Sequence, residues 1–129
     1  MKLLTVLALP STVSNIDRVR DTFNNLDVEI VIIPVGGDFN LVVKTPWKFF
    51  IHLDEWLSVD LKEALPYFLE YGDEYQFMSV YRTSKNKVAL SPRLFKSEVR
   101  MLEGCVYPVD LNVSNTIILD GFLYGEEYD

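Results

Sequence analysis

The sequence predicts an α/β domain with parallel strands at its front and antiparallel strands in its C-terminal half. Two apolar runs, residues 2–9 and 28–33, flank a segment with helical apolar spacing, which is the pattern of a βαβ unit. A third apolar run covers residues 49–53, and short apolar runs then alternate with polar turns. A length of 129 residues is typical of one domain, so we expect one core.

The first strand is expected over residues 2–9, where nearly every residue is apolar, as in a strand covered on both faces. The same run resembles a short signal peptide, but Pro10 follows early and no convincing cleavage site follows it, so a strand is the better interpretation. Ser14 is expected to cap the next helix, with Asp17 in the position of a capping box. The buried face of this helix is predicted from its apolar spacing: Ile16, Val19, Phe23 and Leu26.

Ser58 is expected to cap a second helix, which Pro66 should kink or split into two. Its apolar stripe comprises Leu61, Leu65, Phe68 and Leu69. The remaining predicted strands cover residues 75–82, 88–90, 94–95, 105–107 and 116–119. Residues 120–129 form an acidic, aromatic tail for which we expect mobility.

Composition excludes several classes of protein. Half of the chain is apolar (49%) and 24% is charged, which excludes a disordered chain and a coiled coil. The net charge of −7 argues against generic nucleic-acid binding, and no apolar run approaches the ~20 residues of a membrane helix. The single cysteine, Cys105, excludes an internal disulfide and, without an export signal, indicates a cytoplasmic protein.

The end of the third predicted strand is the strongest candidate site. Ligands of open α/β sheets bind outside the carboxyl ends of the strands, where His52, Asp54 and Glu55 stand. Strand alternation predicts His52 and Asp54 on the same side, where an imidazole and a carboxylate can share a divalent cation. The alternative is that the acidic pair only leads into a helix and that His52 is a core histidine.

A second candidate is the basic segment within the acidic half of the chain. Arg82, Arg93 and Lys96 could bind a diphosphate, because arginine matches phosphate oxygens with two hydrogen bonds. The alternative is a solvated hairpin whose charges balance the acidic remainder. Trp56 and Tyr107, near predicted strand ends, could stack on a base or a sugar ring.

The stretch from Trp47 to Leu61 resembles the signature region of family-2 glycosyltransferases with the GT-A fold: a tryptophan, an apolar strand, Asp-x-Asp-Glu, a leucine, a Ser or Thr cap and a helix. Residues 91–96 and 103–107 are similar to later Arg-x-Leu-Phe-Arg and Gly-x-Val-His segments of that family. The resemblance implies a Rossmann-like, three-layer GT-A core spanning residues 1–129.

The resemblance also implies an activity, the transfer of a sugar from a nucleotide-sugar donor to an acceptor with Mn²⁺ or Mg²⁺. Asp54 and Glu55 would then be the catalytic residues, and Asp54 with His52 would hold the metal. The substrate would be contacted by Arg93, Lys96, Trp56 and Tyr107.

Four departures from the family pattern motivate other hypotheses. His52, Pro34 and Tyr107 stand where the family has Asp, Asp and His, and only residues 36–48 connect the second and third strands. A second hypothesis is therefore a non-catalytic GT-A-like binding or interaction module that acts through its acidic, aromatic surface. A third is a nucleotide-binding domain of another type. An open sheet edge, or the helix over residues 59–70, could support a homodimer.

Overall fold

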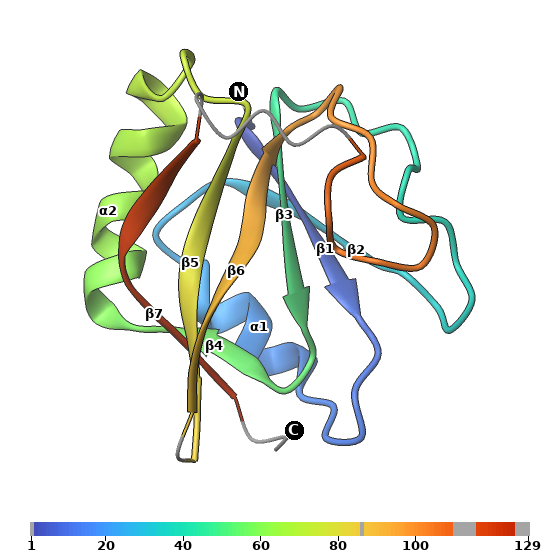
Figure 1. Cartoon of the computed structure of the whole chain (residues 1–129). Helices are drawn as coiled ribbons and strands as arrows, with labels where there is room; N and C mark the ends of the chain where they lie inside the picture. Colours follow the sequence, from blue (N-terminus) through green and yellow to red (C-terminus); the bar gives the residue numbers. More distant parts are fainter. Residues whose placement is uncertain (1, 86, 110–115, 126–129) are drawn as a thin grey trace.

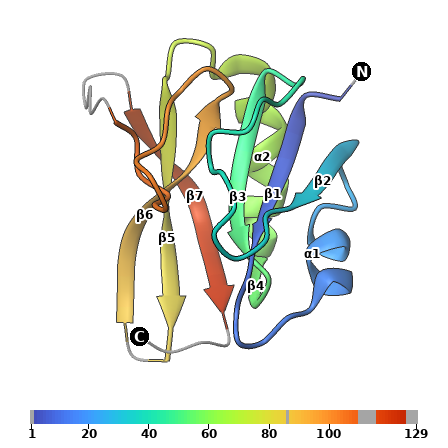
Figure 2. The same ribbon diagram turned by 90° about the vertical axis from the view of Figure 1, so that its right-hand side faces the viewer.

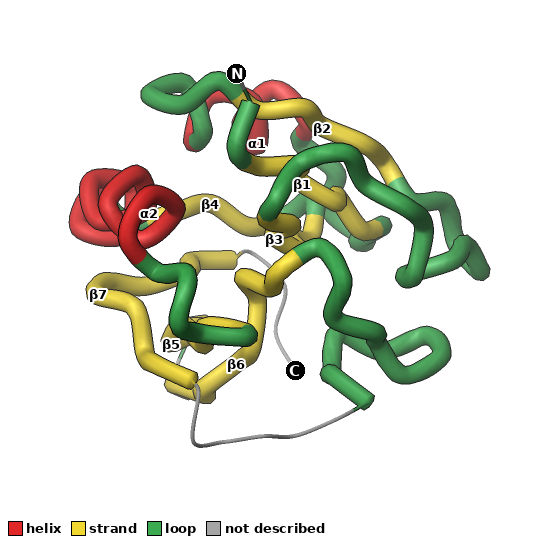
Figure 3. Tube along the Cα trace, turned by 90° about the horizontal axis from the view of Figure 1, so that it is seen from above, coloured by secondary structure: helices red, strands yellow, loops and turns green. Residues whose placement is uncertain are grey.

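The computed structural model describes residues 2–85, 87–109 and 116–125. Seven strands form one mixed sheet in the order β2-β1-β3-β6-β5-β7-β4 (Figure 1). The sheet curls into a half-barrel, and α2 closes the open side of the curl (Figures 2 and 3). The strands are β1 (Leu4–Leu9), β2 (Val28–Ile32), β3 (Trp47–His52), β4 (Glu55–Leu57), β5 (Phe77–Ser84), β6 (Lys87–Lys96) and β7 (Thr116–Gly125); the helices are α1 (Ile16–Thr22) and α2 (Val59–Tyr71).

The predicted Rossmann-like, three-layer α/β core is wrong. Strands hold 43% of the described residues and helices 17%, and both helices in this part of the chain pack into the same apolar cluster on one face of the sheet. Two loops, residues 34–46 and 97–109, cover part of the other face in place of helices, over a cluster that includes Phe50 and Phe95. Residues 34–46 begin with a proline and a glycine pair and have no helical apolar spacing, so they cross the sheet as a loop.

The parallel front of the sheet is confirmed. β1 pairs in parallel with β2 on one side and with β3 on the other, so that Leu4 lies opposite both Val28 and Trp47. All six residues of β1 are buried, which explains why this segment is apolar without alternation. The carboxyl ends of three parallel strands therefore lie side by side.

Of the two predicted helix caps, one is wrong and one is confirmed. Asn15, not Ser14, caps α1, because its side chain accepts a hydrogen bond from Arg18 N (3.0 Å). Ser58 caps α2 as predicted, with Oγ accepting from Leu61 N at 3.2 Å.

Pro66 does not split α2, which runs unbroken from Val59 to Tyr71. A proline at position 66 cannot donate to the carbonyl of Lys62, one turn earlier. The side-chain amide of Asn25 donates to that carbonyl instead, at 2.9 Å. A residue of another segment thus satisfies the acceptor that the proline leaves open.

The C-terminal half has longer strands than predicted. β6 is one strand of ten residues, and β7 continues to Gly125, so residues 120–125 belong to the sheet and not to a tail. The rest of that tail, residues 126–129, lies outside the described residues. Residues 105–107 form no strand, because they belong to a loop closed by the bond from Leu102 N to Tyr107 O (2.8 Å). Neither helix in the described part of the chain is long and apolar enough to cross a bilayer.

Candidate functional site

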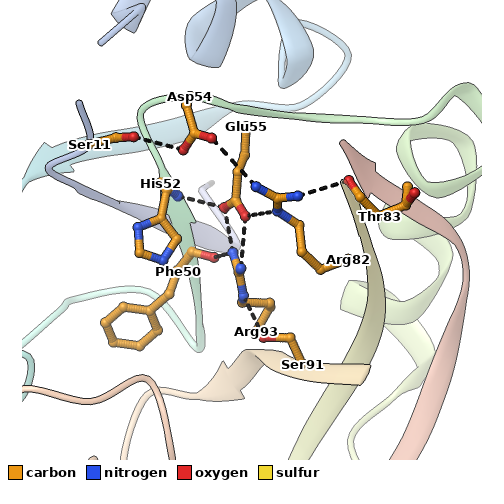
Figure 4. A network of polar contacts seen from close by, with 9 residues as sticks. All are labelled: Ser11, Phe50, His52, Asp54, Glu55, Arg82, Thr83, Ser91 and Arg93. Atoms are coloured by element: carbon orange, nitrogen blue, oxygen red, sulfur yellow. Dashed lines mark hydrogen bonds and ion pairs between the residues drawn. The ribbon is translucent and has the colours of Figure 1, made fainter. Parts of the chain in front are cut away.

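Asp54 and Glu55 lie in a tight connection that reverses the chain between β3 and β4. β3 ends at His52, Leu53 and Asp54 form the turn, and Glu55 begins β4. The predicted alternation from His52 to Asp54 is therefore broken. The imidazole of His52 does not point toward the Asp54 carboxylate (Figure 4).

Glu55 is the centre of a buried network (Figure 4), and its side chain is only 1% exposed. Its Oε1 accepts hydrogen bonds from His52 N (2.7 Å) and from Arg93 Nη1 (2.6 Å). Its Oε2 accepts from Arg82 Nε (2.5 Å) and Arg93 Nη2 (2.8 Å). Each carboxylate oxygen thus has two donors, so the negative charge is held entirely by groups of the protein.

A β-bulge positions Arg93. Along the β5–β6 pair, Met78 lies opposite Leu94 and Ser79 lies opposite Pro92, so Arg93 is an extra residue without a partner in register. Bulges re-aim side chains, and this one lets the guanidinium reach the Glu55 carboxylate. Arg93 also donates to Phe50 O at 3.2 Å and to Ser91 Oγ at 2.8 Å.

Asp54 is also buried, at 1% exposure. Its Oδ1 accepts from Ser11 Oγ (3.0 Å), and its Oδ2 lies 3.4 Å from Arg82 Nη2. Arg82 thus bridges both carboxylates. A guanidinium already supplies the positive charge that the resemblance assigned to a divalent cation.

The electrostatics of Glu55 follow from this arrangement. Burial alone would raise the pKa of its carboxyl group, since a charge is costly in an apolar environment. The charge and hydrogen bonds of Arg93, aided by His52 and its backbone N–H, outweigh burial and lower the pKa to about 2. Glu55 is therefore ionised throughout the physiological pH range.

The other predicted site residues do not gather around this network. Lys96 pairs with Trp47 at the amino end of β3, at the opposite end of the strand from His52, and its ammonium group donates to Asp73 O. The guanidinium of Arg18 lies over the ring of Trp56, with Arg18 Cζ 4.4 Å from the ring centroid. Tyr107 is exposed in the loop of residues 97–109. No group of three His, Cys, Asp or Glu residues suited to a metal occurs among the described residues.

A hollow of about 400 Å³, here called the strand-end hollow, lies at the carboxyl ends of β1, β2 and β3. His52, Ser91 and the buried Arg93 supply polar groups to its wall, and most of the rest is apolar, including Leu9, Phe39 and Val106. A second hollow of about 740 Å³ lies between the two covering loops and shares Gly36, Phe39 and Gly104 with the first.

The covering loops are tied together by a residue that sequence reasoning missed. Asn40 Nδ2 donates to Met101 O (2.9 Å), and Asn40 Oδ1 accepts from Met101 N (2.7 Å). The Asn40 side chain thus bonds to both the N–H and the C=O of Met101, as a residue of a neighbouring β-strand would. Residues 61 positions apart make this contact, so no local pattern could have indicated it.

Sequence reasoning did identify Arg82 and Arg93, but as diphosphate ligands and not as partners of the acidic pair. The available signal was a basic segment in an otherwise acidic half of the chain. Comparison with protein-family models and with curated proteins finds no match to this chain. The functional interpretation therefore depends on the geometry of the site.

Proposed function

We propose that this protein is a non-catalytic binding domain that takes a small, mostly apolar ligand with one hydrogen-bonding group into the strand-end hollow. The observation that carries the proposal is the position of the hollow at the carboxyl ends of three parallel strands. In parallel α/β sheets, ligands bind outside the carboxyl ends of the strands, and β1, β2 and β3 form the parallel part of this sheet. A volume of about 400 Å³ suits a small organic molecule.

The lining supports this class of ligand. Leu9, Phe39 and Val106 offer apolar walls, and the half-buried His52 offers an imidazole. Neutral imidazole both donates and accepts hydrogen bonds, so it can orient a hydroxyl, a carbonyl or an anionic group. The hydroxyl of Ser91 accepts from Arg93 Nε and keeps its own proton to donate.

The carboxylates support binding more than catalysis. A general acid or base needs a pKa near the working pH and access to the substrate. Glu55 has four donors and a pKa of about 2, and Asp54 is buried against Ser11 and Arg82. We assign Glu55 to holding Arg93 and the backbone of His52, two residues that line the hollow, in place.

The test is an NMR titration of the labelled protein with 8-anilinonaphthalene-1-sulfonate, a probe that combines aromatic rings with one anionic group. Saturable shifts are expected for the backbone amides of Gly36, His52, Gly104 and Val106. Val106→Trp should fill the hollow and weaken binding by at least about tenfold, which is ~1.4 kcal/mol. Val42→Trp is the matched control, because Val42 is 92% exposed on a covering loop outside the hollow.

Two outcomes would overturn the proposal. One is an absence of saturable shifts at these amides, and the other is equal binding by the Val106→Trp and Val42→Trp variants. A parallel titration with a nucleoside diphosphate tests the sugar-transfer hypothesis. Binding that requires Mn²⁺ and is lost in Asp54→Ala would favour transfer over the proposal made here.

A further inference from the structure

Lys48 is a buried lysine on the side of the sheet that the two covering loops pack against. Along β3, Trp47, Phe49 and Ile51 belong to the apolar cluster on the helix side. Successive side chains of a strand alternate, so Lys48 points to the opposite side, as Phe50 does. Lys48 is only 2% exposed, whereas lysine is almost never fully buried without a paired charge. Its side chain is therefore enclosed between the sheet and the loops.

The nitrogen of this lysine is held by a carbonyl and not by an acid. Lys48 Nζ donates to Val99 O at 2.7 Å, which ties β3 to the covering loop of residues 97–109. Within the described ranges, no carboxylate lies within ion-pair distance of Lys48. Its neighbours across the sheet, Thr5 on β1 and Phe95 on β6, are uncharged. The burial of Lys48 is thus not explained by an ion pair.

A hollow of about 460 Å³, here called the lysine hollow, borders Lys48 and the covering loops. Val99, whose carbonyl binds Lys48 Nζ, also lines it, with Leu41 and Val43 as apolar walls and Ser97 as a hydroxyl. None of its lining residues lines the strand-end hollow. A volume of this size accepts a small organic molecule beside the lysine.

The surroundings of Lys48 favour its reactive form. Besides Lys48, the charged residues in the lining of the lysine hollow are Glu98 and Arg100, and both are exposed. Burial lowers the pKa of the Lys48 ammonium group below its ordinary value of 10.5, and the negative charge of Glu98 offsets only part of this effect. More of the group is then neutral at pH 7 than in a fully solvated lysine. The neutral amine is the nucleophilic form of lysine.

We propose that the lysine hollow is a site for a small aldehyde, which condenses with Lys48 Nζ to form an imine. The nitrogen lone pair attacks the carbonyl carbon, and a proton passes from the nitrogen to the carbonyl oxygen to give a carbinolamine. Loss of water then forms the C=N bond, so the amine and the aldehyde yield an imine and one water without an oxidant or a reductant.

The geometry also suits the product of this condensation. A protonated imine keeps one N–H, which can still donate to Val99 O as the lysine does now. The low exposure of Lys48 limits the access of water that would hydrolyse the imine. The apolar walls formed by Leu41 and Val43 have the same effect.

Reductive trapping measures this reaction in the original chain. The protein is incubated at pH 7 with benzaldehyde and cyanoborohydride, which reduces an imine to a stable benzylamine, and peptide mass spectrometry follows the labelling of each lysine. Lys48 should be labelled at least about tenfold faster than Lys44, an exposed lysine on a covering loop. The rate at Lys48 should level off as the benzaldehyde concentration rises, because the aldehyde binds first. The rate at Lys44 should rise in proportion to that concentration.

A variant that fills the lysine hollow tests the site itself. Val43→Trp should lower the labelling rate at Lys48 by at least about tenfold, because the indole takes the space of the aldehyde. Val59→Trp is the matched control, because Val59 is 71% exposed on α2 and does not line this hollow. Circular dichroism checks that both variants are folded. If Val43→Trp does not fold, Ser97→Tyr on the other covering loop takes its place.

Three results would overturn the proposal. Labelling of Lys48 no faster than that of Lys44 would assign Lys48 only to tying the covering loop to the sheet. A rate at Lys48 that never levels off would show a reactive amine without a binding site. Equal labelling of Lys48 in the filled variant and in Val59→Trp would place the reaction outside the hollow. None of these results bears on the strand-end hollow, which the NMR titration tests separately.

Discussion

Glu55 and Arg93, which are 38 positions apart in the sequence, form a buried ion pair with two hydrogen bonds, at 2.6 and 2.8 Å. The pair joins β4 to the bulge of β6, although these strands are not neighbours in the sheet. Arg82 of β5 bonds to the same carboxylate, so three strands are linked through one side chain. Glu55 is therefore a structural centre of the half-barrel.

Removing this carboxylate should strongly destabilise the protein. Glu55→Ala leaves the Arg93 guanidinium buried without its counter-charge, and loss of one partner of a buried ion pair costs about 3–5 kcal/mol. Urea unfolding monitored by circular dichroism at pH 7 measures the change in unfolding free energy. Glu63→Ala, an exposed site on α2, should stay within about 0.5 kcal/mol of the original chain. A loss below 1 kcal/mol for Glu55→Ala would contradict the structural role.

Stability should also depend on pH through the same group. The pKa of Glu55 is about 2 in the folded protein against an ordinary value of 4.5. The unfolded chain therefore takes up a proton first, so this stabilisation is complete above pH 4.5 and is lost as the pH falls toward 2. The shift corresponds to about 3 kcal/mol. The stability difference between the original chain and Glu55→Gln should shrink over that range, and a constant difference from pH 7 to pH 2.5 would contradict the prediction.

Gly121 should be intolerant of any side chain. Its φ is +92°, and a Cβ there would lie 2.5 Å from Leu61 N and 2.6 Å from Ser58 Oγ. Gly104 has a similar φ of +68° but open space around its Cα. Gly104→Ala should therefore cost only the backbone strain of about 1–2 kcal/mol. Gly121→Ala should cost about 1–3 kcal/mol more, because it also overpacks β7 against α2. Equal midpoints of thermal unfolding for the two variants would refute the close approach.

The contact between Asn25 and α2 should stabilise the helix around its proline. Asn25→Ala leaves the Lys62 carbonyl without its donor, which should cost about 1 kcal/mol. Asn24→Ala is the control, because its side chain bonds only locally, to Asp21 Oδ1 at 3.2 Å. Amide hydrogen exchange should show faster opening near residues 62–66 in the first variant only. If both variants exchange alike, the bond contributes nothing.

The capping residues give a comparison between sequence and structure. Ser58 Oγ accepts from Leu61 N and also from Phe122 N (2.9 Å), so Ser58→Ala should cost about 1–2 kcal/mol. Ser14→Ala should be nearly neutral, because Asn15 is the residue that caps α1. Chemical denaturation of the two variants measures the difference. A larger loss for Ser14→Ala would restore the prediction made from the sequence.

Local patterns predicted the elements that local forces determine. The parallel βαβ unit, the buried third strand and the Ser58 cap all follow from apolar spacing and capping chemistry within about a dozen residues. The wrong fold class arose from the resemblance, which supplied layers of helix that this chain does not contain among its described residues. The prediction made β6 and β7 too short, because the exposed parts of these strands mix polar and apolar residues. Those parts are strands because β6 pairs with β5 in a hairpin and the end of β7 pairs with β4.

The sequence by itself indicated Asp54, Glu55, Arg82 and Arg93 as candidate site residues, because two acids follow an apolar strand and a basic run lies within an acidic half of the chain. Only the tertiary structure decided that these groups neutralise one another. The turn between β3 and β4 directs the Glu55 side chain into the protein, and the bulge in β6 directs the Arg93 side chain toward the Glu55 carboxylate. Charges placed in an apolar interior are stable only when paired, and the pairing depends on strand order, which no short stretch of sequence specifies.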